Sequence, residues 1–201
     1  MQWIYSVKKT TRDGVRQQKY IFKNLAMQTI NGEKLHVRQS IDGSMLYYKN
    51  TEHGVLYYGK EKQQDNKSKF DIDEHYVFRY PLQTGTHWED ITYSRLLVKT
   101  GPPQKTVFKI IAKVPLSVEV ESVDDVVHVP AGIFQHCVRI KKKGSAYKDA
   151  GNYIGLTIVT VTETSWFAPG VGLVKSIREE TTEQKALDRG ELIIELESFT
   201  S

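Results

Sequence analysis

The chain has 201 residues, of which 39% are hydrophobic and 26% are charged, and its formal net charge is +4. These values exclude a wholly disordered chain, and the length suits one domain, residues 1–201, with a substantial core. No stretch approaches the roughly 18 apolar residues of a membrane-spanning helix. The single cysteine, Cys137, excludes an intramolecular disulfide, and its apolar neighbours indicate a small buried thiol.

Basic residues are spread along the whole sequence, so the net charge does not indicate a nucleic-acid-binding protein. The dense basic run at residues 139–143 (Arg-Ile-Lys-Lys-Lys) leads into Gly144-Ser145. We interpret it as a solvated strand end and turn rather than as a polyanion site.

The first third of the chain has the period of β-strands. Trp3, Tyr5 and Val7 stand at every second position, as in a strand with one buried face. Turn signals follow at Arg12-Asp13-Gly14, Asn31-Gly32, Asp42-Gly43 and His53-Gly54. These intervals predict an antiparallel meander with short connections. The Tyr-Tyr pairs at 47–48 and 57–58 lie in adjacent predicted strands, where they can oppose one another.

In the rest of the chain, predicted strands are separated by polar stretches. We expect surface loops at residues 60–69 and 144–152, because both are polar and lack an apolar period. A turn is expected at Asp124-Asp125. Strands are predicted around residues 76–80, 91–98, 108–114, 116–120, 133–141, 153–164, 173–180 and 192–197.

The run Trp166–Lys175 predicts a sharp hinge between two strands. It contains two aromatic residues, then Pro169, Gly170 and Gly172. Proline cannot donate to a sheet ladder, and glycine takes positive φ without strain, so the chain should turn here. Trp166 and its neighbour should pack this corner against the core.

These patterns together predict an all-β, mainly antiparallel protein of about ten or more strands with little helix. Such a sheet must curl, close or split into layers. We expect one strongly curved sheet or half-barrel.

Three segments resemble a family of bacterial cell-envelope proteins of unknown function, many of them lipoproteins. They are Pro81-Leu82 with Gly85 and Trp88, then residues 129–134 (Val-Pro-Ala-Gly-Ile-Phe) with Cys137-Val138, then residues 166–175 (Trp-Phe-Ala-Pro-Gly-Val-Gly-Leu-Val-Lys). They are similar to the "VPAGTF" and "W(Y/F)APGVGLVK" motifs of that family. The resemblance implies an exported, curved antiparallel sheet similar to the half-barrels of periplasmic lipoprotein carriers, with no established enzymatic activity.

The expected location is therefore the periplasm or cell envelope. Residues 1–5 begin in strand-like sequence without a signal peptide or lipobox cysteine, which leaves a cytoplasmic protein as the alternative. Membrane attachment would need an anchor that this sequence does not contain.

Sequence motifs that would indicate a catalytic, metal or cofactor site are weak. The six histidines show no short spacing typical of metal ligands, and the acidic cluster Asp71, Asp73 and Glu74 lacks the glycine of a calcium loop. No serine lies in a nucleophile elbow, and Gly170-Val171-Gly172 is not a dinucleotide fingerprint. We therefore expect a protein that is not an enzyme, with no catalytic residues, cofactor or metal.

The aromatic residues support a binding protein. We expect an apolar or amphiphilic ligand, such as a lipid, or another envelope protein to contact the concave side of the sheet. The candidate contacts are Trp3, Tyr5, Tyr47, Tyr57, Tyr76, Phe78 and Trp88. The alternative that these side chains simply fill the core stays open.

Two other functions stay open. A structural or assembly subunit would pair through an exposed edge strand. A hydrolase would need a catalytic group gathered from several strands, which requires that two or more of His53, His75, His87, His128, Asp71 and Asp73 converge in a pocket.

Overall fold

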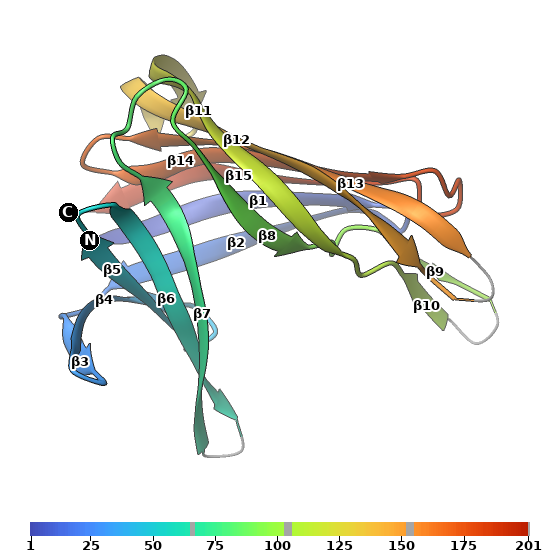
Figure 1. The fold of residues 1–201 in the computed structure, drawn as a ribbon, viewed down its shortest axis with the longest axis horizontal. Coiled ribbons are helices and arrows are strands. Elements are labelled where there is room, and N and C mark those ends of the chain that lie inside the picture. Colours follow the sequence, from blue (N-terminus) through green and yellow to red (C-terminus); the bar gives the residue numbers. More distant parts are fainter. Residues whose placement is uncertain (65–66, 103–105, 152–154, 201) are drawn as a thin grey trace.

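The structure is a computed structural model that describes residues 1–64, 67–102, 106–151 and 155–200, and this part of the chain contains strands and turns but no helix (Figure 1). The strands are β1 (Gln2–Thr11), β2 (Gly14–Asn24), β3 (Gln28–Ile30), β4 (Glu33–Ser40), β5 (Met45–Thr51), β6 (Gly54–Gln64), β7 (Lys67–Arg79), β8 (His87–Tyr93), β9 (Val98–Gly101), β10 (Thr106–Lys109), β11 (Lys113–Val129), β12 (Gly132–Asp149), β13 (Leu156–Ala168), β14 (Gly172–Thr182) and β15 (Arg189–Thr200). Accordingly, the described residues hold no helix with the length and apolar character needed to cross a membrane. The predicted all-β fold is confirmed.

One sheet of 13 strands makes up most of the molecule, in the order β7-β6-β5-β4-β2-β1-β15-β14-β13-β12-β11-β8, with β3 paired to β4. Strands β9 and β10 form a separate ladder. Because β1 pairs with β15, the first and last thirds of the chain join in one continuous surface. Figure 1 shows that β4–β7 bend away from β12–β15, so the predicted strongly curved antiparallel sheet is also confirmed.

Side-chain alternation decides which residues lie inside the curve. In β1, Trp3, Tyr5 and Val7 are buried at every second position. Cross-strand partners share a face of the sheet, so this face continues through Leu196, the partner of Tyr5, and Ile194, the partner of Val7. We call this inner side of the sheet the concave face.

The predicted turns lie where glycine or asparagine permits positive φ. Asn31 and Gly32 have φ of 51° and 83° in the β3–β4 hairpin, and Gly43 has φ of 78° between β4 and β5. These angles are those that a short hairpin connection requires. The predicted meander in the first third is therefore confirmed.

The predicted hinge at residues 166–175 is the turn of the β13–β14 hairpin. Gly170 and Gly172 have φ of 71° and 94°. Trp166 is half-buried at this corner, and its Nε1 donates a hydrogen bond to the Asp125 carboxylate at 2.9 Å. Asp125 lies inside β11, so the turn predicted at Asp124-Asp125 is wrong: the carboxylate faces the tryptophan instead of ending a strand.

Three other predictions for polar segments are wrong. Strands β6 and β7 extend through the described part of residues 60–69, and residues 65–66 lie outside the described chain. Strand β12 continues to Asp149 through most of the loop expected at 144–152, of which residue 152 is not described. Residues 139–143 lie in the middle of β12 and not at its end. In each case backbone pairing to a long neighbouring strand outweighs the weak strand propensity of polar residues.

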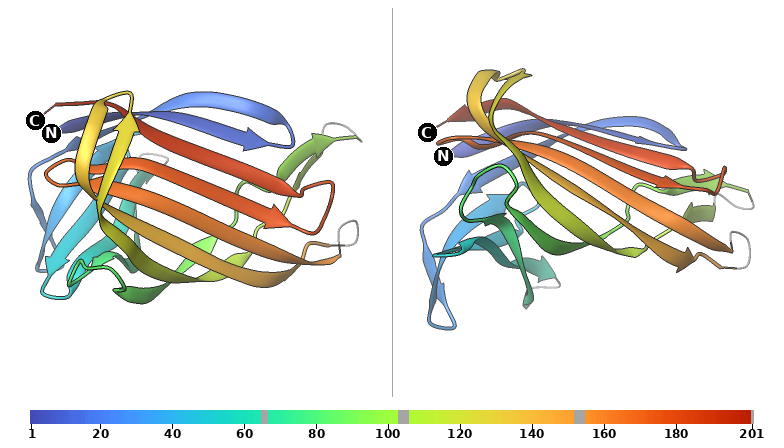
Figure 2. Two further views of the ribbon diagram at one scale, coloured as in Figure 1. Left: turned by 90° about the horizontal axis from the view of Figure 1, so that it is seen from above. Right: turned by 45° about the horizontal axis from the view of Figure 1, so that its top comes forward.

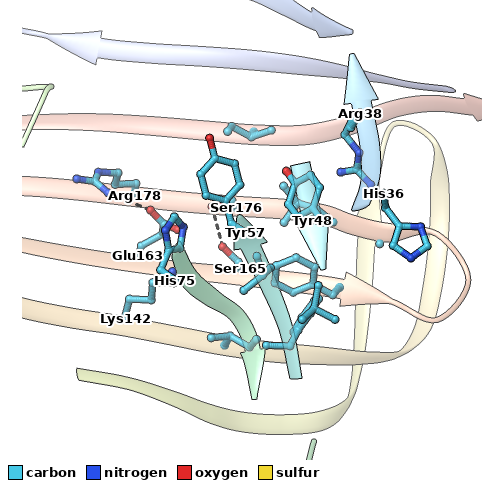
Figure 3. A pocket seen from close by; sticks show the side chains of 18 of the residues that line it. His36, Arg38, Tyr48, Tyr57, His75, Lys142, Glu163, Ser165, Ser176 and Arg178 are labelled. Carbon is cyan, nitrogen blue, oxygen red and sulfur yellow. Dashed lines mark hydrogen bonds and ion pairs between the residues drawn. The ribbon is translucent and has the colours of Figure 1, made fainter. Parts of the chain in front are cut away.

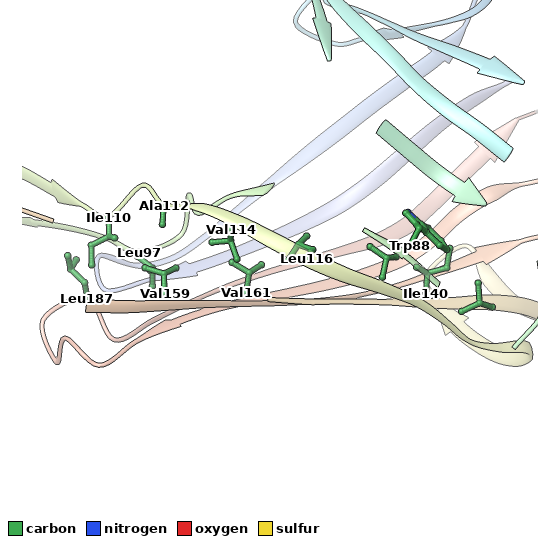
Figure 4. Packing of buried hydrophobic residues seen from close by; sticks show 12 residues of the cluster. Trp88, Leu97, Ile110, Ala112, Val114, Leu116, Ile140, Val159, Val161 and Leu187 are labelled. Atoms are coloured by element: carbon green, nitrogen blue, oxygen red, sulfur yellow. The ribbon is translucent and has the colours of Figure 1, made fainter. Parts of the chain in front are cut away.

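The core has three parts. The largest lies where β8 and the first half of β11 fold over β12 and β13, and Figure 4 shows its side chains between these layers. A second part lies around Trp3 and Tyr5 and includes Cys137, which is fully buried as expected. The third, with Leu35 and Tyr47, lies on the opposite side of β4–β6 from the concave face.

The end of β11 and the start of β12 bend across the neighbouring strands, as Figure 2 shows. The Ala131 amide at the hairpin tip donates to the Leu196 carbonyl of β15 at 3.0 Å. The tip is therefore attached to the middle of the sheet, although β11 and β15 are not neighbours in its strand order.

The connection from β8 to β11 closes one end of the concave face. The backbone amides of Arg95 and Leu96 donate to one carboxylate oxygen of Glu180 at 2.8 Å each. A Cβ placed on Gly190 would lie 2.4 Å from the Leu96 Cβ, so only glycine allows this segment to approach β15 so closely. The other end of the concave face remains open and forms the cleft described next.

Candidate functional site: a cleft on the concave face

A cleft of about 540 Å³ lies between β4–β7 on one side and β12–β15 on the other (Figure 3). Its lining comes from both ends of the chain, because the curved sheet brings β4–β7 opposite the C-terminal strands. The residues that line it are Asn24, His36, Val37, Arg38, Tyr48, Asn50, Val55, Tyr57, His75, Val77, Phe78, Arg95, Ile140, Lys142, Glu163, Ser165, Phe167, Gly172, Leu173, Ser176, Arg178, Leu192 and Ile194.

Apolar side chains cover part of the floor and the facing wall. Phe167 from the β13–β14 corner meets Phe78 of β7 edge to face, with ring centroids 4.6 Å apart. Ile140, Leu192 and Ile194 extend this surface across β12 and β15. The cleft therefore offers an apolar area that an uncharged chain or ring could contact.

Aromatic rings form the wall on β5–β7. Tyr48 and Tyr57 are register partners with ring centroids 5.6 Å apart, which confirms that the two Tyr-Tyr segments oppose one another. The His75 ring lies 4.8 Å from the ring of Tyr57. Burial raises the pKa of Tyr57 to about 12, with the nearby Tyr48 adding to the shift, so its hydroxyl is neutral at physiological pH and can donate a hydrogen bond.

The polar part of the floor is tightly paired. Ser165 and Ser176 hydroxyls lie 2.9 Å apart on neighbouring strands. The Arg178 guanidinium contacts Glu180 at 2.8 Å and Glu163 at 3.2 Å. These groups fix the shape of the floor, because their charges and hydrogen bonds are satisfied within the sheet.

Lys142, from the basic run in β12, also faces this cleft. Its Nζ contacts the Asp90 carboxylate of β8 at 2.8 Å, and the Asp90 side chain is 6% exposed. The lysine is therefore neutralised locally and does not form part of a polyanion surface.

The cleft continues into the seam between the two edge strands, β7 and β8. A second hollow of about 560 Å³ lies there, lined by Asp73 and His75 of β7 and by Asp90–Tyr93 of β8. It shares with the first cleft the residues Tyr57, His75, Arg95, Lys142, Glu163 and Arg178. The two hollows therefore form one space that opens at the seam.

Of the seven predicted contact residues, two line the cleft and five are packed elsewhere. Tyr57 and Phe78 line the cleft. Trp3 and Tyr5 are buried on the concave face, where Trp3 Nε1 donates to the Val171 carbonyl at 2.8 Å and the Tyr5 hydroxyl to the Leu173 carbonyl at 3.0 Å. These two side chains hold β1 to the β13–β14 corner and are covered by other residues.

The remaining three predicted contacts pack elsewhere. Trp88 is buried in the largest core cluster, and Tyr76 packs against the same cluster. Tyr47 lies in the third cluster, on the side of the sheet opposite to the cleft, and its hydroxyl donates to Glu61. Its neighbour Tyr48 occupies the concave face instead, because successive side chains of a strand point to opposite faces.

The groups required for the hydrolase alternative are largely dispersed. Asp73 and His75 both line the seam, but the His75 Nδ1 lies 3.0 Å from the backbone carbonyl of Asp73, whereas the carboxylate is 3.9 Å away. His53, His87 and His128 are exposed and do not line either hollow. Among the described residues there is no group of three or more His, Cys, Asp or Glu side chains that could hold a metal ion.

Sequence reasoning missed several charged residues of the cleft, among them Arg38, Glu163 and Arg178. Each sits among polar residues in its strand and resembles an ordinary solvent-facing position. The available sequence signal is the two-residue alternation of a strand. Arg38 lies two residues from His36, and Arg178 lies two residues from Ser176, so each arginine lies on the same face of its strand as that residue.

No protein-family model matches the chain, and no curated protein matches it in sequence. Among solved structures, a "putative exported protein with YmcC-like fold" from Bacteroides fragilis is similar with a TM-score of 0.40 and 15% identity, over 100% of this chain and 95% of the other. A "putative lipoprotein" from Parabacteroides distasonis is similar with a TM-score of 0.38 and 14% identity, over 98% and 94% of the two chains. Similarity at this level assigns no ligand or activity, which must be inferred from the cleft itself.

Proposed function

We propose that this chain is a non-enzymatic binding protein of the cell envelope that holds an amphiphilic molecule in the cleft of its concave face. The observation that carries the proposal is the cleft of about 540 Å³, which has a partly apolar floor and a wall with tyrosine, histidine and arginine side chains. Placement in the envelope is supported by the resemblance of residues 166–175 to the envelope-protein motif.

The size and lining of the cleft suit a small lipid or similar amphiphile. Ligand sites commonly measure about 300–1,000 Å³ and combine apolar surface with a few polar groups that set orientation. The aromatic pair Phe78 and Phe167 supplies contact area for an apolar part, while Tyr48, Tyr57 and His75 supply donors and acceptors near the rim. The opening at the β7–β8 seam leaves room for the apolar chain of the ligand to extend beyond the floor of the cleft.

Two measurements test binding directly. Native mass spectrometry of the purified protein, followed by solvent extraction, should reveal a bound amphiphile that survives purification. Isothermal titration with ten-carbon probes, namely decanoate, decyl phosphate, decanol and decyltrimethylammonium, should show binding of at least one probe below its micellar concentration or, for decanol, below its solubility limit. A protein that carries no extractable amphiphile and binds none of the four probes would overturn the proposal.

Ile194→Trp is expected to weaken probe binding by about tenfold or more, equal to about 1.4 kcal/mol. Ile194 is a half-buried residue of the cleft floor, so an indole at this position would occupy space that the ligand needs. The matched control is Ile193→Trp, because Ile193 is also half-buried but lies next to Ile194 in β15 and points to the other face. Titration of both variants with the best-binding probe gives the comparison.

The control should bind within about twofold of the unmodified protein. Thermal unfolding followed by circular dichroism would show whether either indole disturbs the sheet. Equal loss of binding in both variants, at equal stability, would place the ligand outside the cleft.

A further inference from the structure

Arg38 is an unusual cation within the cleft. It is half-buried in β4, and its guanidinium carbon lies 4.2 Å from the centroid of the Trp3 ring and 5.4 Å from that of Tyr48. Its Nε donates to the Asn24 side-chain oxygen at 3.3 Å. Within the part of the chain that the structure describes, no carboxylate forms an ion pair with it.

The other half-buried or buried cations of the cleft are neutralised. Lys142 is paired with Asp90, and Arg178 is paired with both Glu163 and Glu180. Arg95 is exposed near the seam and is accessible to water. Positive charge that is partly removed from water and lacks an acidic partner therefore concentrates at the Arg38 end of the cleft.

Aromatic packing can hold such a cation in place without neutralising it. A guanidinium over an aromatic face gains about 0.5–2 kcal/mol, while its terminal N–H groups remain able to donate. The planar fork of these groups matches the oxygen atoms of a carboxylate or phosphate. Figure 3 shows Arg38 and His36 on the same strand at one end of the cleft, with Tyr48 beside them.

Neighbouring groups complete a donor-rich site. Burial raises the pKa of Tyr48, against the opposing effect of the Arg38 charge. The Tyr48 hydroxyl is therefore neutral at physiological pH and able to donate. The Asn50 amide and the His36 ring lie 3.4 Å apart on the same wall and add further polar atoms.

We propose that the Arg38 end of the cleft binds the anionic group of the ligand, a carboxylate or a phosphate. The apolar part of the molecule then lies along the floor toward Phe78 and Phe167. This inference rests on the proposed function, since it assigns the headgroup class and the orientation of the amphiphile in the same cleft. It also accounts for an arginine that is partly buried without an acidic partner, because the ligand supplies the missing negative charge.

The four ten-carbon probes separate headgroup recognition from binding itself. Decanoate and decyl phosphate should bind about tenfold or more tightly than decanol, and decyltrimethylammonium should bind more weakly than decanol. Arg38→Gln should remove the advantage of the anionic probes, so that decanoate and decyl phosphate bind no more tightly than decanol to the same variant. Arg38→Lys keeps the charge but not the fork, so it should retain only part of the advantage.

The chain offers a matched control in Arg79. This arginine is half-buried in β7, and its guanidinium carbon lies 4.7 Å from the Tyr76 ring centroid, yet it lies outside the cleft lining. Arg79→Gln removes the same charge and the same kind of aromatic contact. It should leave the preference for anionic probes unchanged, and the thermal stability of both variants should be measured in parallel.

Each outcome has a distinct meaning. Binding of all four probes with equal affinity, or an unchanged preference in Arg38→Gln, would overturn the headgroup assignment and leave the proposed function standing. Failure of every probe to bind, together with the absence of an extractable amphiphile, would overturn the proposed function. Inorganic phosphate that binds as tightly as decyl phosphate, with loss in Arg38→Gln, would support the anion site but overturn an amphiphile as its ligand.

Discussion

Replacing Glu180 with alanine is expected to lower the free energy of unfolding by about 3–5 kcal/mol, the usual cost of breaking a buried ion pair by removing one of its partners. The Glu180 side chain is completely buried. One of its oxygens accepts the Arg95 and Leu96 amides, and the other accepts the Arg178 Nε at 2.8 Å. The substitution would remove all three contacts at once. Urea denaturation followed by circular dichroism measures the effect.

The neighbouring residue provides the control for this experiment. Glu179 lies next to Glu180 in β14 and is exposed, so Glu179→Ala should change the stability by less than about 0.5 kcal/mol. A Glu180→Ala protein within 1 kcal/mol of the unmodified one, by the same denaturation method, would show that the carboxylate does not hold the β8–β11 connection.

A double substitution separates the stability contribution of the Arg178–Glu180 ion pair from that of the two backbone amides that donate to Glu180. Arg178→Met combined with Glu180→Met removes both partners of the buried ion pair, which can be nearly neutral when the replacements pack well; it also leaves the partly exposed Glu163 without its contact to Arg178. The amides of Arg95 and Leu96 would still lack an acceptor. We therefore expect the double variant to be more stable than Glu180→Met alone but less stable than the unmodified protein. Equal stability of the single and double variants would mean that Arg178 is not coupled to Glu180.

Gly144→Ala is expected to destabilise the protein by at least about 3 kcal/mol, at or above the usual range for overpacking. A Cβ on Gly144 would lie 1.9 Å from the carbonyl oxygen of Pro115 and 3.1 Å from the Leu116 side chain. The contacted oxygen belongs to the backbone of Pro115 in β11, which crosses close over β12 at this point. Rotation of a side chain therefore cannot relieve the clash. Thermal and urea unfolding should both show the loss.

Gly101→Ala is the matched control. Among the described residues, a Cβ at Gly101 would meet only the Phe108 ring at 3.6 Å, an ordinary contact, and the φ of Gly101 is not in the left-handed region. This substitution should be neutral or slightly stabilising, because alanine restricts the unfolded chain. If Gly144→Ala proved equally neutral, β11 would not cross β12 as closely as the structure shows.

Gly144 also shows why a glycine in polar sequence can lead to a wrong prediction of a loop. Glycine in polar sequence is typical of turns, and residues 144–152 were accordingly predicted to be a loop. The same residue type also occurs where another backbone passes within contact distance. Only the position of β11, fixed by contacts far along the chain, distinguishes the two cases.

Local residue patterns are sufficient to predict most of the strands and many of the turns. Two-residue alternation, as in Trp3, Tyr5 and Val7, and the positive-φ signals at Asn31-Gly32 and Gly170 depend only on neighbouring residues, so they could be recognised without a structure. The division of aromatic residues between core and cleft could not. Tyr47 and Tyr48 are adjacent and chemically identical, and the path of the curved sheet decides which of them faces the cleft. The role of Arg38 and the burial of Glu180 were likewise decided by tertiary structure, because their partners come from strands separated by many residues in the chain.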